Sequence, residues 1–161
     1  MHGEATLVIA YHPESVLDAG CGTGRVAIEL SRHGIVTLGV DVDHSMIAEA
    51  MRLAPELAWI QADLAGLDLG TRFDVVILAG NVPLFCPSAK RSALIERCAA
   101  HVAEGGRMIG GYQLNRGYDL SDYDAACSLG SLVLEERWST WDRQPFGPES
   151  TYAVSVHVAT A

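Results

Sequence analysis

Short runs of valine, isoleucine and leucine alternate along the chain with segments in which apolar residues recur every three or four positions. The runs are typical of buried strands, and the recurring positions are typical of amphipathic helices. The pattern predicts strands near residues 15–20, 35–41, 57–62, 73–79, 105–112, 131–138 and 150–159. It predicts helices near residues 3–11, 24–33, 44–53, 88–103 and 121–129. This alternation indicates a three-layer α/β fold, a doubly wound, Rossmann-like sheet with helices on both faces.

The ends of the predicted helices carry their own signals. Asp43 is expected to cap the helix at 44–53. Ser121, with Asp124 three residues later, resembles a capping box at the start of the last helix. The apolar face of the helix at 44–53 is expected to hold Met46, Ile47, Ala50 and Met51.

The segment between the last two predicted strands has no helical pattern and contains Pro145, Gly147 and Pro148. Two strands that are joined without a crossover helix form a hairpin. The seven-stranded sheet is therefore expected to be parallel except for an antiparallel last strand. No repeat or interdomain linker stands out, so residues 1–161 are expected to form a single domain.

Composition narrows the class of protein. Hydrophobic residues make up 49% of the chain, which is sufficient for a packed core. No apolar run approaches the roughly 20 residues that a membrane-spanning helix needs, and the first residues lack the pattern of a secretory signal. We therefore expect a cytoplasmic protein with no membrane partner. The four cysteines lack metal-site spacing, so no metal is expected.

The net charge of the chain indicates which classes of ligand and partner it can bind. The formal net charge is −9, and the eleven basic residues, ten arginines and Lys90, are scattered through the chain. A nucleic-acid partner would require a basic stripe that neutralises phosphates, so none is expected. A cationic cofactor, in contrast, is compatible with an acidic protein.

Three glycines at alternate positions, Gly20, Gly22 and Gly24, separate a predicted strand from a predicted helix. Glycine permits positive φ and a close approach of a ligand to the backbone, as in several nucleotide-binding folds. Asp18 precedes this loop and narrows the choice of ligand. A carboxylate there would repel the pyrophosphate of a dinucleotide, whereas it suits a ligand with a sulfonium and an ammonium group.

Residues 17–25, Leu-Asp-Ala-Gly-Cys-Gly-Thr-Gly-Arg, closely resemble motif I of the class I S-adenosylmethionine-dependent methyltransferases. The likeness extends through residues 39–43, 60–64 and 73–78 and covers nearly the whole chain. The resemblance implies S-adenosylmethionine as cofactor, S-adenosylhomocysteine as product, and the strand order 3-2-1-4-5-7-6. It says almost nothing about the methyl acceptor.

A carboxylate at the end of the second strand is placed to accept hydrogen bonds from both ribose hydroxyls of the cofactor. Asp43 is better placed than Asp41 to cap the next helix, so Asp41 is assigned to the ribose. The resemblance implies that Asp63 accepts the adenine amino group and that Leu64 offers a backbone amide. Met46 is expected either to cover the adenine or to pack in the core. The predicted cofactor-binding residues are Asp18, Gly20, Cys21, Gly22, Gly24, Arg25, Asp41, Val42, Met46, Asp63, Leu64, Gly80 and Asn81.

Ligands of an open parallel sheet collect beyond the carboxyl ends of its strands. Segments 80–86, 111–118 and 138–150 are expected to reach that edge with aromatic and polar side chains suited to a small molecule. Alternatively, Trp141 and Phe146 only cover the end of the sheet. The residues predicted to place the acceptor are Asn81, Tyr112 and Arg116. No general base is assigned, because methyl transfer can proceed by placement of an acceptor that is already nucleophilic.

The leading hypothesis is a methyltransferase that acts on a small molecule. A non-catalytic S-adenosylmethionine-binding module and a nicotinamide-dependent oxidoreductase are the alternatives. Members of the family that the chain resembles often carry an N-terminal lid or an inserted cap over the acceptor, and few residues precede the first predicted strand here. The acceptor site is therefore expected to be open, or closed by a second copy in a homodimer, or closed by residues that would precede Met1.

Overall fold

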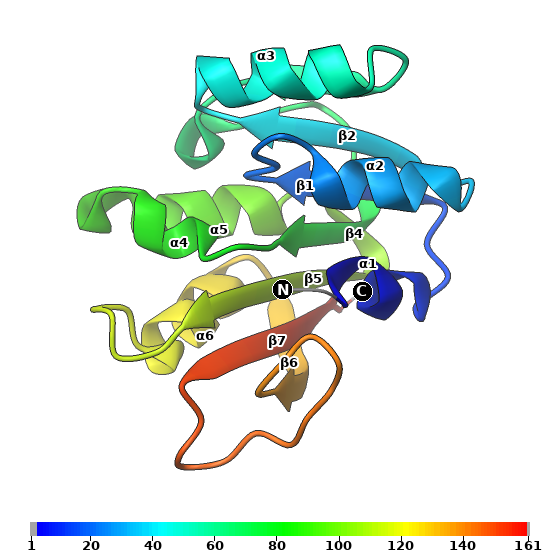
Figure 1. The fold of residues 1–161 in the computed structure, drawn as a ribbon. Helices are drawn as coiled ribbons and strands as arrows, with labels where there is room; N and C mark the ends of the chain where they lie inside the picture. Colours follow the sequence, from blue (N-terminus) through cyan, green and yellow to red (C-terminus); the bar gives the residue numbers. More distant parts are fainter. Residues whose placement is uncertain (1–2, 161) are drawn as a thin grey trace.

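The computed structural model describes residues 3–160 and contains one seven-stranded sheet in the order β3-β2-β1-β4-β5-β7-β6 (Figure 1). The strands are β1 (Ser15–Ala19), β2 (Val36–Asp41), β3 (Ala58–Gln61), β4 (Phe73–Leu78), β5 (Val102–Gln113), β6 (Leu132–Trp138) and β7 (Tyr152–Ala159). The α-helices are α1 (Glu4–Ile9), α2 (Arg25–Arg32), α3 (His44–Leu53), α4 (Val82–Phe85), α5 (Arg91–Ala99) and α6 (Leu120–Leu129). Two short 3-10 helices are η1 (Leu64–Gly66) and η2 (Ser88–Lys90). The strand order that the resemblance implied is confirmed.

The direction of the strands also agrees with the sequence pattern. The pairs β3–β2, β2–β1, β1–β4 and β4–β5 are parallel. Strand β7 pairs in the antiparallel direction with both β5 and β6. The antiparallel last strand, predicted from the missing crossover helix, is therefore confirmed. Strands β1 to β6 all run in one direction, so the loops after β1, β2, β4 and β5 meet at one edge of the sheet.

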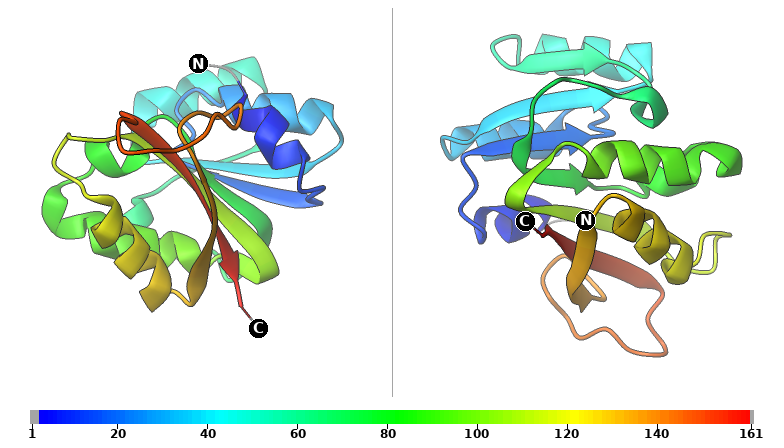
Figure 2. Two further views of the ribbon diagram at one scale, coloured as in Figure 1. Left: turned by 90° about the horizontal axis from the view of Figure 1, so that it is seen from below. Right: turned by 180° about the vertical axis from the view of Figure 1, so that it is seen from behind.

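Helices cover both faces of the sheet (Figure 2). Helices α1 and α2 pack on one face, where Leu7, Val26 and Leu30 join a buried cluster with Ile109 of β5. Helices α5 and α6 pack on the other face, where Ile95 of α5 belongs to a second buried cluster. Strands that are buried on both faces explain why the central strands read as continuous apolar runs.

Two boundaries in the second half differ from the prediction. The helix predicted at 88–103 is divided into η2 and α5 and ends at Ala99. Strand β5 begins at Val102 rather than near 105, because Val102 pairs with Phe73 before the register shifts. Helix α4 was not predicted, since four residues with a proline in the first turn are too short for a periodic pattern.

Two predictions, one about the buried face of α3 and one about the start of α6, are wrong in part. In α3 only Ile47 and Ala50 are buried, while Met46 is 40% exposed and Met51 50% exposed. The N-cap of α6 is Asp119, which makes no side-chain cap, so the expected capping box at Ser121 lies inside the helix. Asp43 does cap α3, and its side chain accepts hydrogen bonds from the backbone amides of Ser45 and Met46. Among residues 3–160, every helix is too short or too polar to cross a membrane.

Candidate cofactor and acceptor site

The glycine loop, residues 20–24, connects β1 to α2 at the carboxyl edge of the sheet. Gly20, Gly22 and Gly24 have φ values of 78°, 56° and 91°, in the left-handed region that favours glycine. A Cβ atom on Gly20 would lie 2.7 Å from Val82, and one on Gly24 would overlap the ring of Trp59. A Cβ atom on Gly22 would meet nothing within 4 Å. The loop is thus tightly packed from behind and open at its centre.

Asp41, at the end of β2, lies directly against this loop. Its Oδ2 accepts a hydrogen bond from the Gly22 backbone amide at 2.9 Å, and its Oδ1 accepts one from the Asp43 amide at 2.9 Å. Asp43 caps α3 with its own side chain. The predicted cap by Asp43 is therefore confirmed, while Asp41 faces the loop.

Asp18 lies beneath the loop and is 2% exposed. Its Oδ2 accepts a hydrogen bond from the Ala27 backbone amide of α2 at 3.2 Å. Burial is the largest cause that raises the pKa of Asp18, to about 7, and the charges of Asp41 and Glu4 act in the same direction. The Ala27 amide and the Arg25 guanidinium oppose this rise. A carboxyl group with a pKa near neutrality therefore sits behind the loop.

Cys21 contributes its backbone to the loop rather than its thiol. The side chain packs beside a small buried cluster that contains Trp59, and burial raises the pKa of the thiol. The thiol donates weakly to the Gly22 carbonyl oxygen at 3.5 Å. Cys21 is thus one of the supports of the loop.

Glu4 of α1 is a charged residue near the loop that the sequence analysis missed. It is 1% exposed, and its Oε2 lies 2.5 Å from Nη2 of Arg25, the first residue of α2. No hydrogen-bond partner for Oε1 occurs within residues 3–160. A signal was present in the sequence, because Glu4 precedes the buried Leu7 and Val8 by three and four positions. That spacing places a carboxylate on the apolar face of the helix.

The segments after β2 and β3 hold the residues expected to surround an adenine. Asp63 accepts the Ala65 amide at 3.0 Å through Oδ1, and Lys90 Nζ lies 3.1 Å from Oδ2. These two hydrogen bonds, the Ala65 one first, lower the pKa of Asp63. Leu64 is 5% exposed and packs in the core, so its side chain is not available to a ligand.

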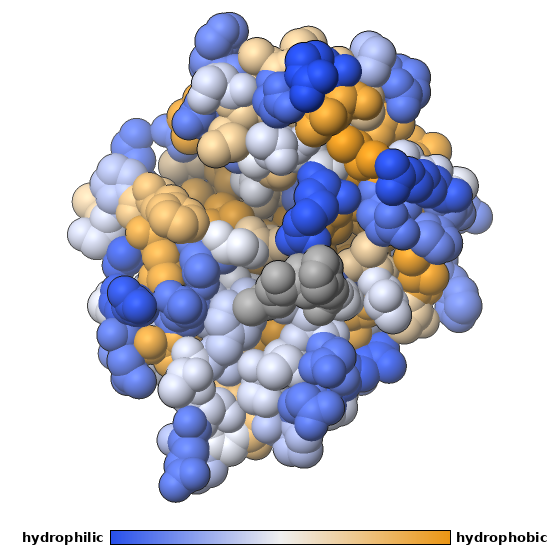
Figure 3. All heavy atoms as spheres, viewed as in Figure 1, coloured by the Kyte–Doolittle hydropathy of each residue, from blue (hydrophilic) through white to orange (hydrophobic). Residues whose placement is uncertain are grey.

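Met46 and Val42 are 40% and 64% exposed and lie where α3 begins. Figure 3 shows the surface hollowed between α3 and α4, with apolar atoms in the recess. Met46 was expected either to cover the adenine or to pack in the core, and its exposed position favours the first alternative.

Gly80 and Asn81 follow β4 with φ values of 73° and 65°. Asn81 Oδ1 accepts a hydrogen bond from the Gln113 amide at 2.7 Å, and the Asn81 amide donates to the Gly111 carbonyl at 3.3 Å. Asn81 therefore ties the end of β4 to the end of β5. A Cβ atom on Gly80 would meet nothing within 4 Å, so the backbone is open there.

The structure separates the other two residues predicted to place the acceptor. Tyr112 is 1% exposed and its ring packs with those of Tyr118 and Tyr123 under α6. Burial raises the pKa of the Tyr112 hydroxyl, which finds no hydrogen-bond partner in the described part of the chain. Arg116, by contrast, is exposed after β5 and lines a cavity. Tyr112 is thus inside the core in this conformation, away from the edge where Arg116 lies.

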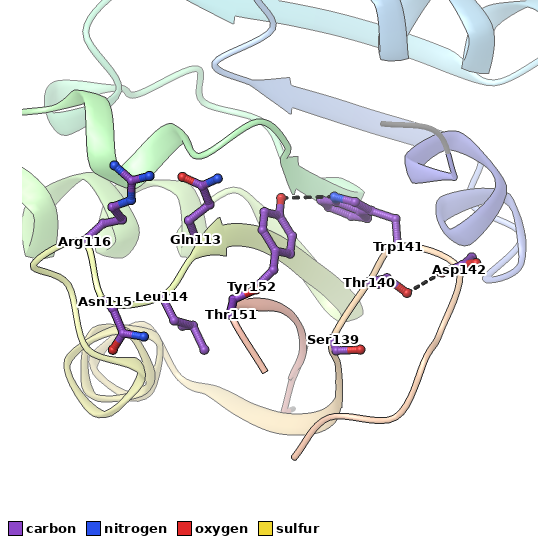
Figure 4. A pocket seen from close by; sticks show the side chains of 10 residues that line it. All are labelled: Gln113, Leu114, Asn115, Arg116, Ser139, Thr140, Trp141, Asp142, Thr151 and Tyr152. Atoms are coloured by element: carbon purple, nitrogen blue, oxygen red, sulfur yellow. Dashed lines mark hydrogen bonds between the residues drawn. The ribbon is translucent and has the colours of Figure 1, made fainter. Parts of the chain in front are cut away.

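That cavity, called here the β5–β7 cavity, has a volume of about 610 Å³ and lies beyond the ends of β5 and β6 (Figure 4). It is lined by Gln113, Leu114, Asn115, Arg116, Ser139, Thr140, Trp141, Asp142, Thr151 and Tyr152. Trp141 is 2% exposed, and its Nε1 donates a hydrogen bond to the Tyr152 hydroxyl at 3.1 Å. Trp141 therefore covers the end of the sheet and also forms a wall of the cavity.

Comparisons with known proteins agree with this arrangement. A family model described as "Methyltransferase domain" matches residues 16–106. The crystal structure of a TehB-like S-adenosylmethionine-dependent methyltransferase from Corynebacterium glutamicum superposes with a TM-score of 0.93 at 32% identity. This superposition covers 99% of this chain and 89% of that one.

Two curated relatives are similar over part of their length. A magnesium-protoporphyrin O-methyltransferase of Synechocystis sp. is 34% identical over 92 residues, which are 53% of this chain and 39% of that protein. A ubiquinone biosynthesis O-methyltransferase of Nitrobacter winogradskyi is 32% identical over 140 residues, which are 80% of this chain and 49% of that protein. The chain thus spans less than half the length of these two relatives. Its sequence and fold together show that it belongs to the class I S-adenosylmethionine-dependent methyltransferase family.

Proposed function

We propose that this chain binds S-adenosylmethionine at the glycine loop and transfers its methyl group to a small molecule held in the β5–β7 cavity. The observation that carries the proposal is the hydrogen bond from the Gly22 amide to Asp41, beside a loop centre that no side chain fills. A carboxylate beside an open glycine backbone is the arrangement that binds the ribose in doubly wound folds.

The residues at this edge fit the cofactor in their chemistry. Asp41 supplies two oxygens to the ribose hydroxyls, and Asp63 with the Leu64 amide supplies an acceptor and a donor to the adenine. Met46 and Val42 offer apolar contact, while Gly80 and Asn81 present backbone near the methionine half. When ionised, Asp18 places negative charge behind the loop, which attracts the cationic groups of the ligand. When bound, the cofactor supplies an electrophilic methyl group on a sulfonium.

The lining of the cavity fits a small polar acceptor. Amide, hydroxyl and guanidinium groups of Gln113, Tyr152 and Arg116 can orient such a molecule, while Trp141 supplies an apolar wall. Among the described lining residues there is no histidine, and Asp142 is engaged with the Thr140 hydroxyl. The proposed catalysis is therefore placement, in which the cavity holds the nucleophilic atom in line with the methyl group. The relatives named as O-methyltransferases make an oxygen nucleophile the first to test.

Isothermal titration calorimetry with S-adenosylmethionine, S-adenosylhomocysteine and NADH tests the cofactor. The first two are expected to bind and NADH is not. Asp41→Ala is expected to weaken binding about 100-fold, because two charge-assisted hydrogen bonds are removed. Asp43→Ala is the matched control. It is expected to lower stability by about 1 kcal/mol through the lost cap and to leave affinity within about threefold.

An assay of S-adenosylhomocysteine release with a panel of hydroxylated, carboxylated and amine acceptors tests the transfer. Turnover that is lost in Asp41→Ala supports a methyltransferase. Tight cofactor binding without turnover on any acceptor favours a non-catalytic binding module. Binding of NADH alone would overturn the proposal.

A further inference from the structure

We propose that Glu4, together with Arg25, binds the α-amino acid end of the cofactor. The inference rests on the proposed function and adds a residue of α1 to the site. It assigns a ligand role to a buried carboxylate that is only partly paired.

The Glu4 carboxylate is buried, and only one of its two oxygens is paired with a charge. It is 1% exposed, yet only Oε2 has a charged partner, Arg25 at 2.5 Å. Within residues 3–160, Oε1 has no hydrogen-bond partner. Burial of a carboxylate oxygen without a partner is costly, so natural proteins rarely keep one without a use. A ligand that donates a hydrogen bond to Oε1 would remove this cost.

The charges of Glu4 and Arg25 also complement those of the amino acid end of the cofactor. The amino acid end of the cofactor carries an ammonium and a carboxylate on the same carbon atom, and Glu4 and Arg25 present the opposite pair of charges. Arg25 is 60% exposed at its side chain, whereas that of Glu4 is 2% exposed. The guanidinium is therefore free to turn toward a ligand carboxylate, while the Glu4 carboxylate stays fixed for the ammonium.

Glu4 and Arg25 also lie close to the glycine loop. Arg25 directly follows Gly24, the last residue of the glycine loop, and both Arg25 and Glu4 act electrostatically on Asp18 beneath the loop. Three charged groups thus lie near the loop that follows β1, whereas Asp63 follows β3, two strands away in the sheet. Since Asp63 is assigned to the adenine, an extended cofactor would bring its amino acid end toward Glu4.

Helix α1 is fixed well enough to hold Glu4 in this position. Leu7 and Val8 are buried in the core cluster beneath α1. A Cβ atom on Gly3 would lie 3.3 Å from Cβ of Trp141, so the start of α1 is packed against the wall of the β5–β7 cavity. If Glu4 were purely structural, it would only connect α1 to α2 through Arg25, and its loss would not distinguish between ligands. If it binds the amino acid end, its loss weakens only ligands that have that end.

The test compares two ligands that share an adenosyl group and differ at the other end. S-adenosylhomocysteine has the amino acid end, and 5′-methylthioadenosine lacks it. Glu4→Gln is expected to weaken S-adenosylhomocysteine binding at least about tenfold, because a charge-assisted hydrogen bond is lost. It is expected to leave 5′-methylthioadenosine binding within about twofold. Isothermal titration calorimetry measures both affinities, and thermal melting reports any loss of fold.

Glu29→Gln is the matched control, because Glu29 also pairs with an arginine of α2 but the pair is exposed. It is expected to change neither affinity. Arg25→Gln is a second variant and is expected to weaken S-adenosylhomocysteine selectively, as Glu4→Gln does. Equal losses for both ligands, or no loss for either, would overturn the inference. Wild-type protein that binds neither S-adenosylhomocysteine nor S-adenosylmethionine would instead overturn the proposed function itself.

Discussion

The two halves of the carboxyl edge are built in different ways. At the glycine loop, the candidate groups are fixed by the backbone: Asp41 and Asp18 each accept backbone amide hydrogens, and the glycines adopt left-handed φ values. At the β5–β7 cavity, the lining groups are mostly side chains that project from loops, such as Arg116. Backbone geometry tolerates few substitutions, whereas projecting side chains can change without refolding the chain.

This difference explains how one fold can keep its cofactor and change its acceptor. Trp59 fills the space behind Gly24 and Gly39, so the loop conformation depends on the packing of a whole side of the sheet. At the cavity, the Ser139 hydroxyl instead donates to the Gln144 carbonyl oxygen of the same loop, and Thr151 is exposed. Substitutions at the loop are therefore expected to cost stability and cofactor affinity together, and substitutions at the cavity to affect the acceptor alone.

The largest effect is expected from Gly24→Ala. The added Cβ would overlap the Trp59 ring, and the φ of 91° is unfavourable for alanine. We expect a loss of about 3 kcal/mol in the free energy of unfolding, measured by urea denaturation. Gly22→Ala is the control, since its Cβ meets nothing within 4 Å. It is expected to stay folded within about 1 kcal/mol and to bind the cofactor more weakly. Equal stability losses in the two variants would contradict the packing argument.

The next largest effect is expected on the pH dependence of stability, through the charge of Asp18. Its pKa is about 7 in the folded protein, compared with 3.8 in the unfolded chain. The folded state therefore keeps a proton that the unfolded state releases, and this contribution to stability is lost as the pH rises from about 4 through 7. Asp18→Asn cannot ionise, so we expect it to exceed the wild type in unfolding free energy by about 2 kcal/mol at pH 8, with a smaller gap at pH 4.

Asp18→Asn also separates an effect of Asp18 on stability from an effect on cofactor binding. If ionised Asp18 attracts the cofactor, wild-type affinity should increase as the pH rises through about 7, and Asp18→Asn should bind weakly at every pH. Calorimetry across this range measures the dependence. An affinity that is flat with pH in the wild type would show that Asp18 only supports α2 through Ala27.

The contrast between the two halves also explains what the sequence could predict. The glycine loop and the roles of Asp41 and Asp43 follow from local rules of φ and helix capping, which act over a few residues. The inward direction of Tyr112 does not follow from such rules. Both faces of β5 are buried, so alternation gives no sign of which residues point toward α6. The spacing of Glu4 from Leu7 and Val8 indicates its burial, but its pairing with Arg25 on another helix appears only in three dimensions.

At the cavity, Tyr152→Phe removes the hydroxyl that accepts the Trp141 indole hydrogen. We expect the KM for the acceptor to rise about threefold to tenfold, because Trp141 is no longer oriented, while cofactor affinity stays unchanged. Tyr11→Phe is the matched control, because it also removes a hydroxyl hydrogen bond, to Glu136, but lies outside the cavity lining. A parallel loss of cofactor affinity in Tyr152→Phe would mean that the two halves are not independent.

The smallest effect is expected at Lys90, the sole lysine of the chain. Its ammonium lies 3.1 Å from Asp63, but the two side chains are 55% and 50% exposed, so solvent and salt screen the pair. Lys90→Gln should weaken S-adenosylhomocysteine binding by about twofold at low salt and have no effect at high salt. Arg52→Gln, which breaks the exposed pair with Glu49, is the control and should change nothing. A loss above about tenfold that persists in high salt would mean that Lys90 contacts the cofactor directly. The cofactor half would then depend on a projecting side chain as well as on its backbone, and the contrast between the halves would narrow.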